Sequence, residues 1–149
     1  MTNLIITEPS IFYKQGDSLV LLDSFEKNFF DLIITSPPYN LEKDYESKIT
    51  FENYLNDQEK IIGKLVPLLT DRGSICWQVG NTIEPKTKEI VPLDIHFYNI
   101  FKSHGLFLRN RIIWTFGHGL HSKKRFSGRY ETILWFSKTE EYIFNLIES

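Results

Sequence analysis

Hydrophobic positions divide the chain into short continuous runs and one long periodic stretch. Four runs with aliphatic, β-branched or aromatic character predict the principal strands: residues 31–35, 74–79, 106–116 and 130–136. The apolar runs at residues 10–14 and 142–146 predict two minor strands, the second at the edge of a sheet.

Helical spacing of apolar residues predicts three helices between these strands. Between residues 51 and 69 apolar residues recur every three or four positions, as on one face of a helix, and Pro67 is expected to kink the last turn. Residues 18–25 predict a shorter helix with Asp17 or Ser18 as its N-cap, and residues 92–103 predict another that begins at Pro92. A polar loop is expected between residues 80 and 91.

The order of these elements is strand, helix, strand, helix, strand, and right-handed crossovers fold this order into a parallel sheet between layers of helices. The last strand follows its neighbour without an intervening helix, so it is expected to pair with it antiparallel. With 149 residues and no internal repeat or linker, the chain predicts one domain. The fold class is therefore α/β: a three-layer αβα sandwich whose sheet is mostly parallel with a terminal antiparallel strand.

Composition excludes several classes of protein. The chain has 42% hydrophobic and 24% charged residues, and no apolar run approaches the roughly 20 residues of a membrane span. Its single cysteine, Cys76, excludes a disulfide framework and a cysteine-built zinc site. The N-terminal residues lack the basic and apolar regions of a secretory signal. A soluble protein of the cytoplasm, without a membrane partner, is expected.

Charge is strongly segregated along the chain. Residues 1–101 carry nine Lys and Arg against fifteen Asp and Glu, residues 102–138 carry eight against one, and residues 139–149 carry none against three. These sums of −6, +7 and −3 give the net charge of −2. A basic segment is most often a solvated face, but histidines and aromatic residues among these bases also suit contact with nucleic acid.

The segment with the clearest chemistry is Asp31-Leu-Ile-Ile-Thr-Ser-Pro-Pro-Tyr-Asn40, where a buried strand leads into a rigid polar loop. Open α/β sheets bind ligands at the carboxyl ends of their strands. Pro37 and Pro38 have fixed φ angles and no N–H, so the loop offers only acceptors: the Ser36 hydroxyl and the carbonyls of Ser36 and Pro37. Such a surface suits an amino group, and the Tyr39 ring can lie against a planar ligand.

Thr35-Ser-Pro-Pro-Tyr-Asn40 resembles the (D/N/S)-P-P-(Y/F) motif of amino-directed DNA methyltransferases, which methylate adenine N6 or cytosine N4 with S-adenosylmethionine. Three further blocks resemble the group in which the catalytic half precedes the cofactor half: Gly16-Asp17-Ser18, Asp71-Arg-Gly-Ser-Ile-Cys-Trp-Gln-Val-Gly-Asn81 and Arg125-Phe-Ser-Gly-Arg-Tyr-Glu131. The resemblance covers residues 11–144. It implies a partial Rossmann-like methyltransferase fold and a site-specific enzyme of a restriction-modification system.

The resemblance also implies roles for particular residues. Ser36, Pro37, Pro38 and Tyr39 would be catalytic: the Ser36 hydroxyl and the Pro37 carbonyl accept hydrogen bonds from the amino group of a flipped base, and Tyr39 stacks on that base. Residues 16–18, that is Gly16, Asp17 and Ser18, would bind S-adenosylmethionine together with Ser36, with Asp17 near the adenine. A plain helix cap is an equally good interpretation of Asp17.

The glycine-rich loop at residues 117–128 is the expected DNA-facing element. The residues expected to contact the phosphates of double-stranded DNA are His118, His121, Lys123, Lys124, Arg125 and Arg129. No third ligand accompanies the two histidines, so no metal site is expected. Arg109 and Arg111 alternate along a strand and can equally form an exposed edge face. The remaining aromatic residues of note, Trp77, Trp114 and Trp135, are expected in the core.

The sequence departs from the family in one respect: it has no F-x-G-x-G segment to cradle the cofactor. Residues 1–149 are therefore expected to form the catalytic domain alone, without the target-recognition and cofactor segments. The sequence is then either a fragment or a subunit that pairs with a second polypeptide or a second copy along an uncovered sheet edge. A Ser at the head of the motif leans towards cytosine N4, but the choice between the two bases stays open.

Two other functions stay open beside this one. The first is a non-catalytic DNA-binding module that keeps the basic loop and transfers nothing. The second is a methyltransferase for protein glutamine or RNA, which carries a related Pro-Pro loop. The second is weakened because such enzymes place a glycine-rich cofactor loop before that motif, and residues 1–35 contain none.

Overall fold

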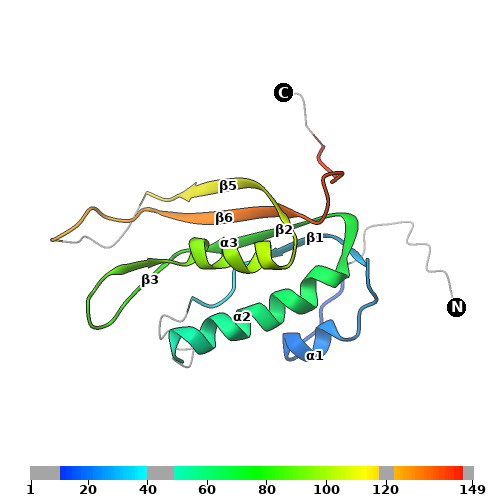
Figure 1. Cartoon of the computed structure of the whole chain (residues 1–149), viewed down its shortest axis with the longest axis horizontal. Coiled ribbons are helices and arrows are strands. Elements are labelled where there is room, and N and C mark those ends of the chain that lie inside the picture. Colours follow the sequence, from blue (N-terminus) through cyan, green and yellow to red (C-terminus); the bar gives the residue numbers. More distant parts are fainter. Residues whose placement is uncertain (1–10, 40–48, 118–122, 146–149) are drawn as a thin grey trace, which may run out of the picture.

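A four-stranded sheet forms the centre of the computed structural model, which describes residues 11–39, 49–117 and 123–145 (Figure 1). Its strands are β1 (Phe30–Thr35), β2 (Leu69–Val79), β5 (Phe107–Thr115) and β6 (Tyr130–Ser137), and they lie in the order β1-β2-β6-β5. β1 and β2 pair parallel, whereas β6 pairs antiparallel with both β2 and β5. Three strands therefore point one way, and β6 alone points the other way.

The antiparallel pairing of the last strand confirms the sequence-based expectation, and its place is a new finding. β6 lies inside the sheet, between β2 and β5, and leaves β1 and β5 as the edges. Thr35 of β1 lies opposite Trp77 of β2 in the parallel pair, and Trp77 lies opposite Leu134 of β6 in the antiparallel pair. The start of β6 is thus at the same end of the sheet as the carboxyl end of β1.

Three α-helices cover one face of this sheet (Figure 1). α1 (Ser18–Leu22) begins at Asp17, α2 (Phe51–Leu65) is capped by the Thr50 side chain, and α3 (Leu93–Ser103) begins after Pro92. A 3-10 turn, Val66–Leu68, follows α2 and contains Pro67, which accounts for the expected change of direction there. None of the helices in the described ranges is long and apolar enough to cross a bilayer.

The core lies between the helices and the covered face of the sheet. Trp77 of β2 and Phe136 of β6 contact Phe101 of α3, with ring centroids 5.4 and 4.7 Å apart, and Trp77 also contacts Phe97. All four side chains are at most 1% exposed. Alternate residues of the strands thus meet the apolar face of α3, as the strand period of two requires.

The opposite face of the sheet is apolar but is not covered by a helix in the described part of the chain. Ile34 of β1 is 71% exposed, and Trp114 of β5 is 57% exposed. The segment after β6 crosses part of this face, where the rings of Tyr142 and Phe144 pack on Trp135. The described residues therefore provide two layers of the αβα arrangement, and the prediction that Trp114 is a core residue is wrong.

Three other expectations differ from the structure. Residues 11–14 and 142–145 form no strand, and Ser10 and Leu146, which complete these two expected strands, lie outside the described residues. The expected loop before α3 contains a hairpin of two short strands, β3 (Asn81–Ile83) and β4 (Ile90–Pro92). With three residues each, these strands are too short to give a clear alternation of apolar and polar positions.

The two arginines of β5 are tied to the protein on this edge strand. Arg111 forms an ion pair with the buried carboxylate of Asp94, with 2.8 Å between Arg111 Nε and Asp94 Oδ2. Arg109 donates hydrogen bonds to the Ser137 hydroxyl and the Thr139 carbonyl. These contacts hold both guanidinium groups against the protein and favour the edge interpretation over a DNA contact.

Candidate active site

The Ser-Pro-Pro-Tyr segment follows β1 directly, and its residues alternate between exposed and buried positions. Ser36 and Pro38 are exposed, whereas Pro37 and Tyr39 are buried. The hydroxyl of Tyr54, in the first turn of α2, donates a 2.8 Å hydrogen bond to the Pro38 carbonyl. The rigid loop is therefore anchored to α2 and holds the Ser36 hydroxyl at the surface.

A chain of hydrogen bonds connects this loop to two other strands. The Ser36 and Tyr39 hydroxyls lie 2.9 Å apart, and Tyr39 Oη donates to Glu131 Oε2 over 3.1 Å. Gln78 Nε2 donates to the same oxygen of Glu131 over 2.7 Å. Gly80 lies directly against this group of side chains. A Cβ at this position would be 3.3 Å from the Tyr39 ring and 3.5 Å from Glu131 Oε1.

Tyr39, the residue expected to stack on the base, is buried. It is only 8% exposed and belongs to the same buried cluster as Trp77. A base can stack on this ring only after the covering groups have moved. The stacking role of Tyr39 stays a prediction, and Asn40 lies outside the described residues.

The expected cofactor residues are not next to Ser36. Asp17 accepts a 2.8 Å hydrogen bond from Leu19 N and so caps α1, as its alternative interpretation predicts. α1 lies beside the far end of α2, where Lys64 bonds the Leu19 carbonyl. Lys64 is ten residues from Tyr54, which is about 15 Å along a helix axis.

Gly16, Asp17 and Ser18 are exposed at that far end of α2, away from Ser36. Their cofactor role stays a prediction that the described residues alone do not support.

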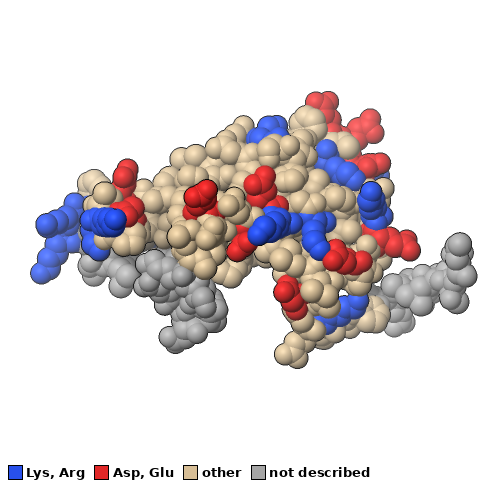
Figure 2. Space-filling model, turned by 60° about the horizontal axis from the view of Figure 1, so that its bottom comes forward, with Lys and Arg blue, Asp and Glu red and all other residues tan. Residues whose placement is uncertain are grey.

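The basic loop lies at the same end of the sheet as Ser36. Its described basic residues, Lys123, Lys124, Arg125 and Arg129, are all exposed. A hydrogen bond from Phe116 N to the Arg129 carbonyl closes the loop two residues before Glu131, which contacts Tyr39. Figure 2 shows Lys and Arg side chains gathered at this end of the molecule. The other two expected DNA contacts, His118 and His121, lie outside the described residues.

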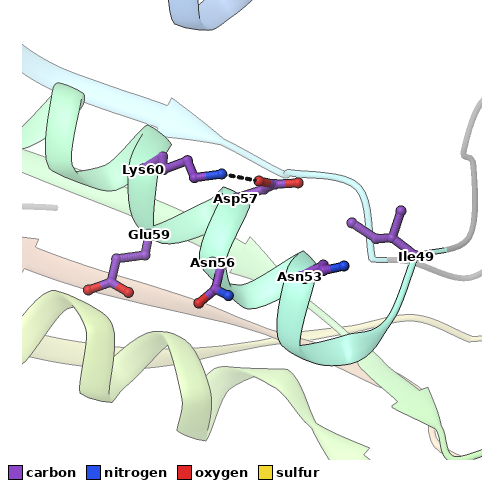
Figure 3. A pocket seen from close by; sticks show the side chains of 6 residues that line it. All are labelled: Ile49, Asn53, Asn56, Asp57, Glu59 and Lys60. Atoms are coloured by element: carbon purple, nitrogen blue, oxygen red, sulfur yellow. Dashed lines mark hydrogen bonds and ion pairs between the residues drawn. The ribbon is translucent and has the colours of Figure 1, made fainter.

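Two other features of the described residues were candidates for a functional site: a metal cluster and a cavity against α2. Over residues 11–39, 49–117 and 123–145, no three His, Cys, Asp or Glu side chains are grouped to hold a metal ion. A cavity of about 600 Å³ lies against α2 (Figure 3). Most of its lining comes from one exposed helix face, where Lys60 and Asp57 form an ion pair with each other. Its side chains do not converge on a common point.

Three residues of the site were missed by sequence reasoning: Tyr54, Gln78 and Glu131. A signal existed for Glu131, because it is the single acidic residue within residues 102–138. Its place at the beginning of a predicted strand, next to the basic loop, also pointed to the motif end of the sheet. Tyr54 and Gln78 carried no such signal, since their roles depend on how α2 and β2 pack.

A strand that leads into an exposed serine on a donor-free loop, beside a basic loop, is an arrangement suited to amino-group chemistry on nucleic acid. The DNA methylase family matches residues 30–148, and the chain belongs to this family. It is 47% identical to the type II methyltransferase M.BglII of Bacillus subtilis over 145 residues, which are 93% of this chain and 40% of M.BglII.

Solved structures show the same fold. The PvuII DNA methyltransferase, described as cytosine-N4-specific, is 26% identical with a TM-score of 0.69, over 85% of this chain and 48% of that protein. A DNA modification methylase of Thermus thermophilus, solved with S-adenosyl-L-methionine, is 23% identical with a TM-score of 0.70. The match covers 88% of this chain and 56% of that protein. The chain thus spans about 40% of the length of the curated relative and about half of each solved structure.

Proposed function

We propose that this chain is the amino-group-binding and DNA-facing part of a DNA methyltransferase, within a restriction-modification system. The substrate is an exocyclic amino nitrogen of a base flipped out of double-stranded DNA, cytosine N4 or adenine N6. The observation that carries the proposal is the exposed Ser36 hydroxyl at the carboxyl end of β1, followed by two prolines that carry no N–H.

An exocyclic amine is a poor nucleophile because its lone pair is delocalised into the ring. Hydrogen bonds from its two N–H groups to the Ser36 hydroxyl and the Pro37 carbonyl favour a pyramidal nitrogen, whose lone pair then points away from the ring. S-adenosylmethionine, when bound, supplies an electrophilic methyl group. The methylated nitrogen is acidic while it carries its extra proton, so Ser36 need not act as a strong base.

The basic loop supports a DNA substrate. Lys123, Arg125 and Arg129 are exposed on the loop between β5 and β6, so they bind phosphates at the end of the sheet that carries Ser36. Such contacts fix the position of DNA without reading its sequence.

We further propose that the open face of the sheet and the edge of β1 are covered by a cofactor-binding half. The face is apolar and exposed at Ile34 and Trp114, and β1 has an unpaired edge in the described sheet. The curated relatives are more than twice as long as the matched region, which is enough chain to supply that half. It belongs either to the same protein or to a second polypeptide; a second copy of this chain is the other outcome of the test.

The test is methyl transfer from tritiated S-adenosylmethionine to mixed duplex DNA. The chain is assayed alone and together with the part of M.BglII that lies outside the matched region. Transfer by the mixture is expected, with loss of about a hundredfold or more in Ser36→Ala because the acceptor for the amino group is gone. Digestion to nucleosides identifies the methylated base.

Ser103→Ala is the matched control, since Ser103 is an exposed helix serine bonded only to the Ile100 carbonyl in the described contacts. Its activity should equal that of the unaltered chain. DNA binding without transfer in every combination would favour the non-catalytic DNA-binding module instead. Size-exclusion chromatography with light scattering distinguishes a complex with the added half from a homodimer.

A further inference from the structure

Ser36, Tyr39, Glu131 and Gln78 are connected by three hydrogen bonds, and the donor and acceptor of each bond can be assigned. A carboxylate only accepts hydrogen bonds, so both contacts of Glu131 Oε2 are donated to it, by Gln78 Nε2 and by Tyr39 Oη. A phenol hydroxyl has one proton, and Tyr39 uses it in the hydrogen bond that it donates to Glu131. At the 2.9 Å contact between the two hydroxyls, Ser36 must therefore be the donor.

This direction decides what Ser36 can offer to a ligand. Its one proton points to Tyr39, so both lone pairs of Oγ are left for donors outside the protein. Without a fixed direction, the same hydroxyl could turn its proton outward and repel an amino group. The carboxylate that fixes the direction lies 92 residues away in the sequence.

We propose that Glu131 is a positioning residue that acts through Tyr39 to hold Ser36 as a hydrogen-bond acceptor for the amino group of the target base. The inference rests on the proposed function, and it assigns to Tyr39 a relay role through its hydroxyl that is separate from the predicted stacking of its ring. Glu131 touches neither base nor cofactor in this assignment.

The surroundings of Glu131 support a dedicated role. It is the one acidic residue in a segment with eight Lys and Arg, yet within the described part of the chain its side-chain bonds go to Tyr39 and Gln78 and to no cation. Hydrogen bonds to a carboxylate are stronger than those between neutral groups, so the bond from Tyr39 to Glu131 is favoured over the reverse orientation of the Tyr39 hydroxyl. Gly80 leaves the space in which the Tyr39 ring and the Glu131 side chain meet.

The first arm of the test is infrared spectroscopy of the whole chain with ring-labelled tyrosine, because the C–O stretching band reports whether a phenol donates or accepts hydrogen bonds. The Tyr39 band is the one that Tyr39→Phe removes. Ser36→Ala should convert it to that of a phenol that only donates, and Glu131→Gln should weaken its donation. A Tyr39 band that does not respond to Glu131→Gln overturns the inference.

The second arm is methyl transfer by the assembled protein described above. Glu131→Gln should lower kcat about tenfold, since an amide oxygen is a weaker acceptor than a carboxylate. The amide can also turn its NH2 towards Tyr39, and the Tyr39 hydroxyl is then free to donate to Ser36. In the Ser36→Ala background the same substitution should have no further effect. Glu140→Gln removes one exposed carboxylate outside the network and should change kcat by less than about twofold.

The outcomes separate the two proposals. If Glu131→Gln lowers kcat equally with and without Ser36, its role is structural and the inference is wrong. If the assembled protein with Ser36 and Glu131 intact transfers no methyl group, the proposed function fails, and with it the assignment of the acceptor to a base. The infrared arm still decides the direction of the hydrogen bonds between Ser36, Tyr39 and Glu131 in that case.

Discussion

The two faces of the central sheet are built from alternate residues of the same strands, yet only one is a finished core. On the helix side, Trp77 and Phe136 are at most 1% exposed. On the other side, Leu32 and Ile34 of β1 are 53% and 71% exposed, although they are equally apolar. The open face therefore carries the composition of an interior without the partner that an interior needs.

This difference separates what stabilises the described domain from what the domain contributes to an assembly. Residues on the helix side should govern the free energy of unfolding. Residues on the open side should leave that free energy almost unchanged and should affect association instead. Three substitutions test this division in order of decreasing expected effect on stability, and a thiol reaction at the open face follows them.

The largest effect is expected for Phe101→Ala. This ring is fully buried between Trp77 and Phe136, so its removal loses apolar burial and leaves a cavity. The free energy of unfolding should fall by about 3–5 kcal/mol, measured by urea denaturation. Phe101→Leu, which fills most of the space, should recover more than half of the loss. A loss below about 1 kcal/mol for Phe101→Ala would contradict a tightly packed helix side.

A smaller effect is expected for Arg111→Met, which leaves the buried carboxylate of Asp94 without its ion pair. Because the Arg111 side chain is about half exposed, solvent screens part of the interaction, and the loss should be about 2 kcal/mol in urea denaturation. The double variant with Asp94→Asn should be more stable than Arg111→Met alone, since no unpaired charge is then buried. If Arg111→Met and the double variant are equally stable, the unpaired Asp94 carboxylate does not lower the free energy of unfolding.

Trp114→Thr should change the free energy of unfolding by no more than about 0.5 kcal/mol, since this indole lies on the open face and is 57% exposed. Threonine keeps the β-propensity of the strand. The same substitution should weaken association with the cofactor-binding half or with a second copy, measured by analytical ultracentrifugation. If it destabilises the chain as strongly as Phe101→Ala, the two faces are not different in kind.

The smallest effect is on reactivity. Cys76 borders a cavity of about 380 Å³ on the open face, and burial raises the pKa of its thiol. A higher pKa leaves less thiolate at a given pH, so its reaction with a disulfide reagent should be slow at neutral pH. The rate should still rise at a pH where that of a free cysteine has levelled off. A covering half should slow the reaction further, and Cys76→Ser provides the blank.

The sequence was sufficient for the elements that have strong local signals. The uninterrupted aliphatic run of β1, the Asp17 cap of α1 and the apolar period of α2 are all determined within a few residues, and the structure agrees with them. It was not sufficient for β3 and β4, whose three residues each give no usable period. The exposure of Trp114 was missed because a strand pattern shows that a side chain faces apolar neighbours, not whether a second layer covers them.

The site divides in the same way. Ser36 and its exposure follow from the loop sequence, because two prolines leave few backbone conformations. Glu131 and Gln78 could not be assigned to that loop, because their contact depends on β6 entering the sheet beside β2. The distance of residues 16–18 from Ser36 was likewise invisible, since it depends on which end of α2 receives α1.

The interior position of β6 has a consequence for the order of events during synthesis. A nascent chain that has left the ribosome as far as Thr115 contains β1, β2 and β5, but β2 and β5 do not pair with each other. Both must wait with open backbone edges until β6 emerges and fills the gap between them, and such long-range closure is slow. Ribosome-bound intermediates of this length should therefore be good clients for chaperones that shield strand edges.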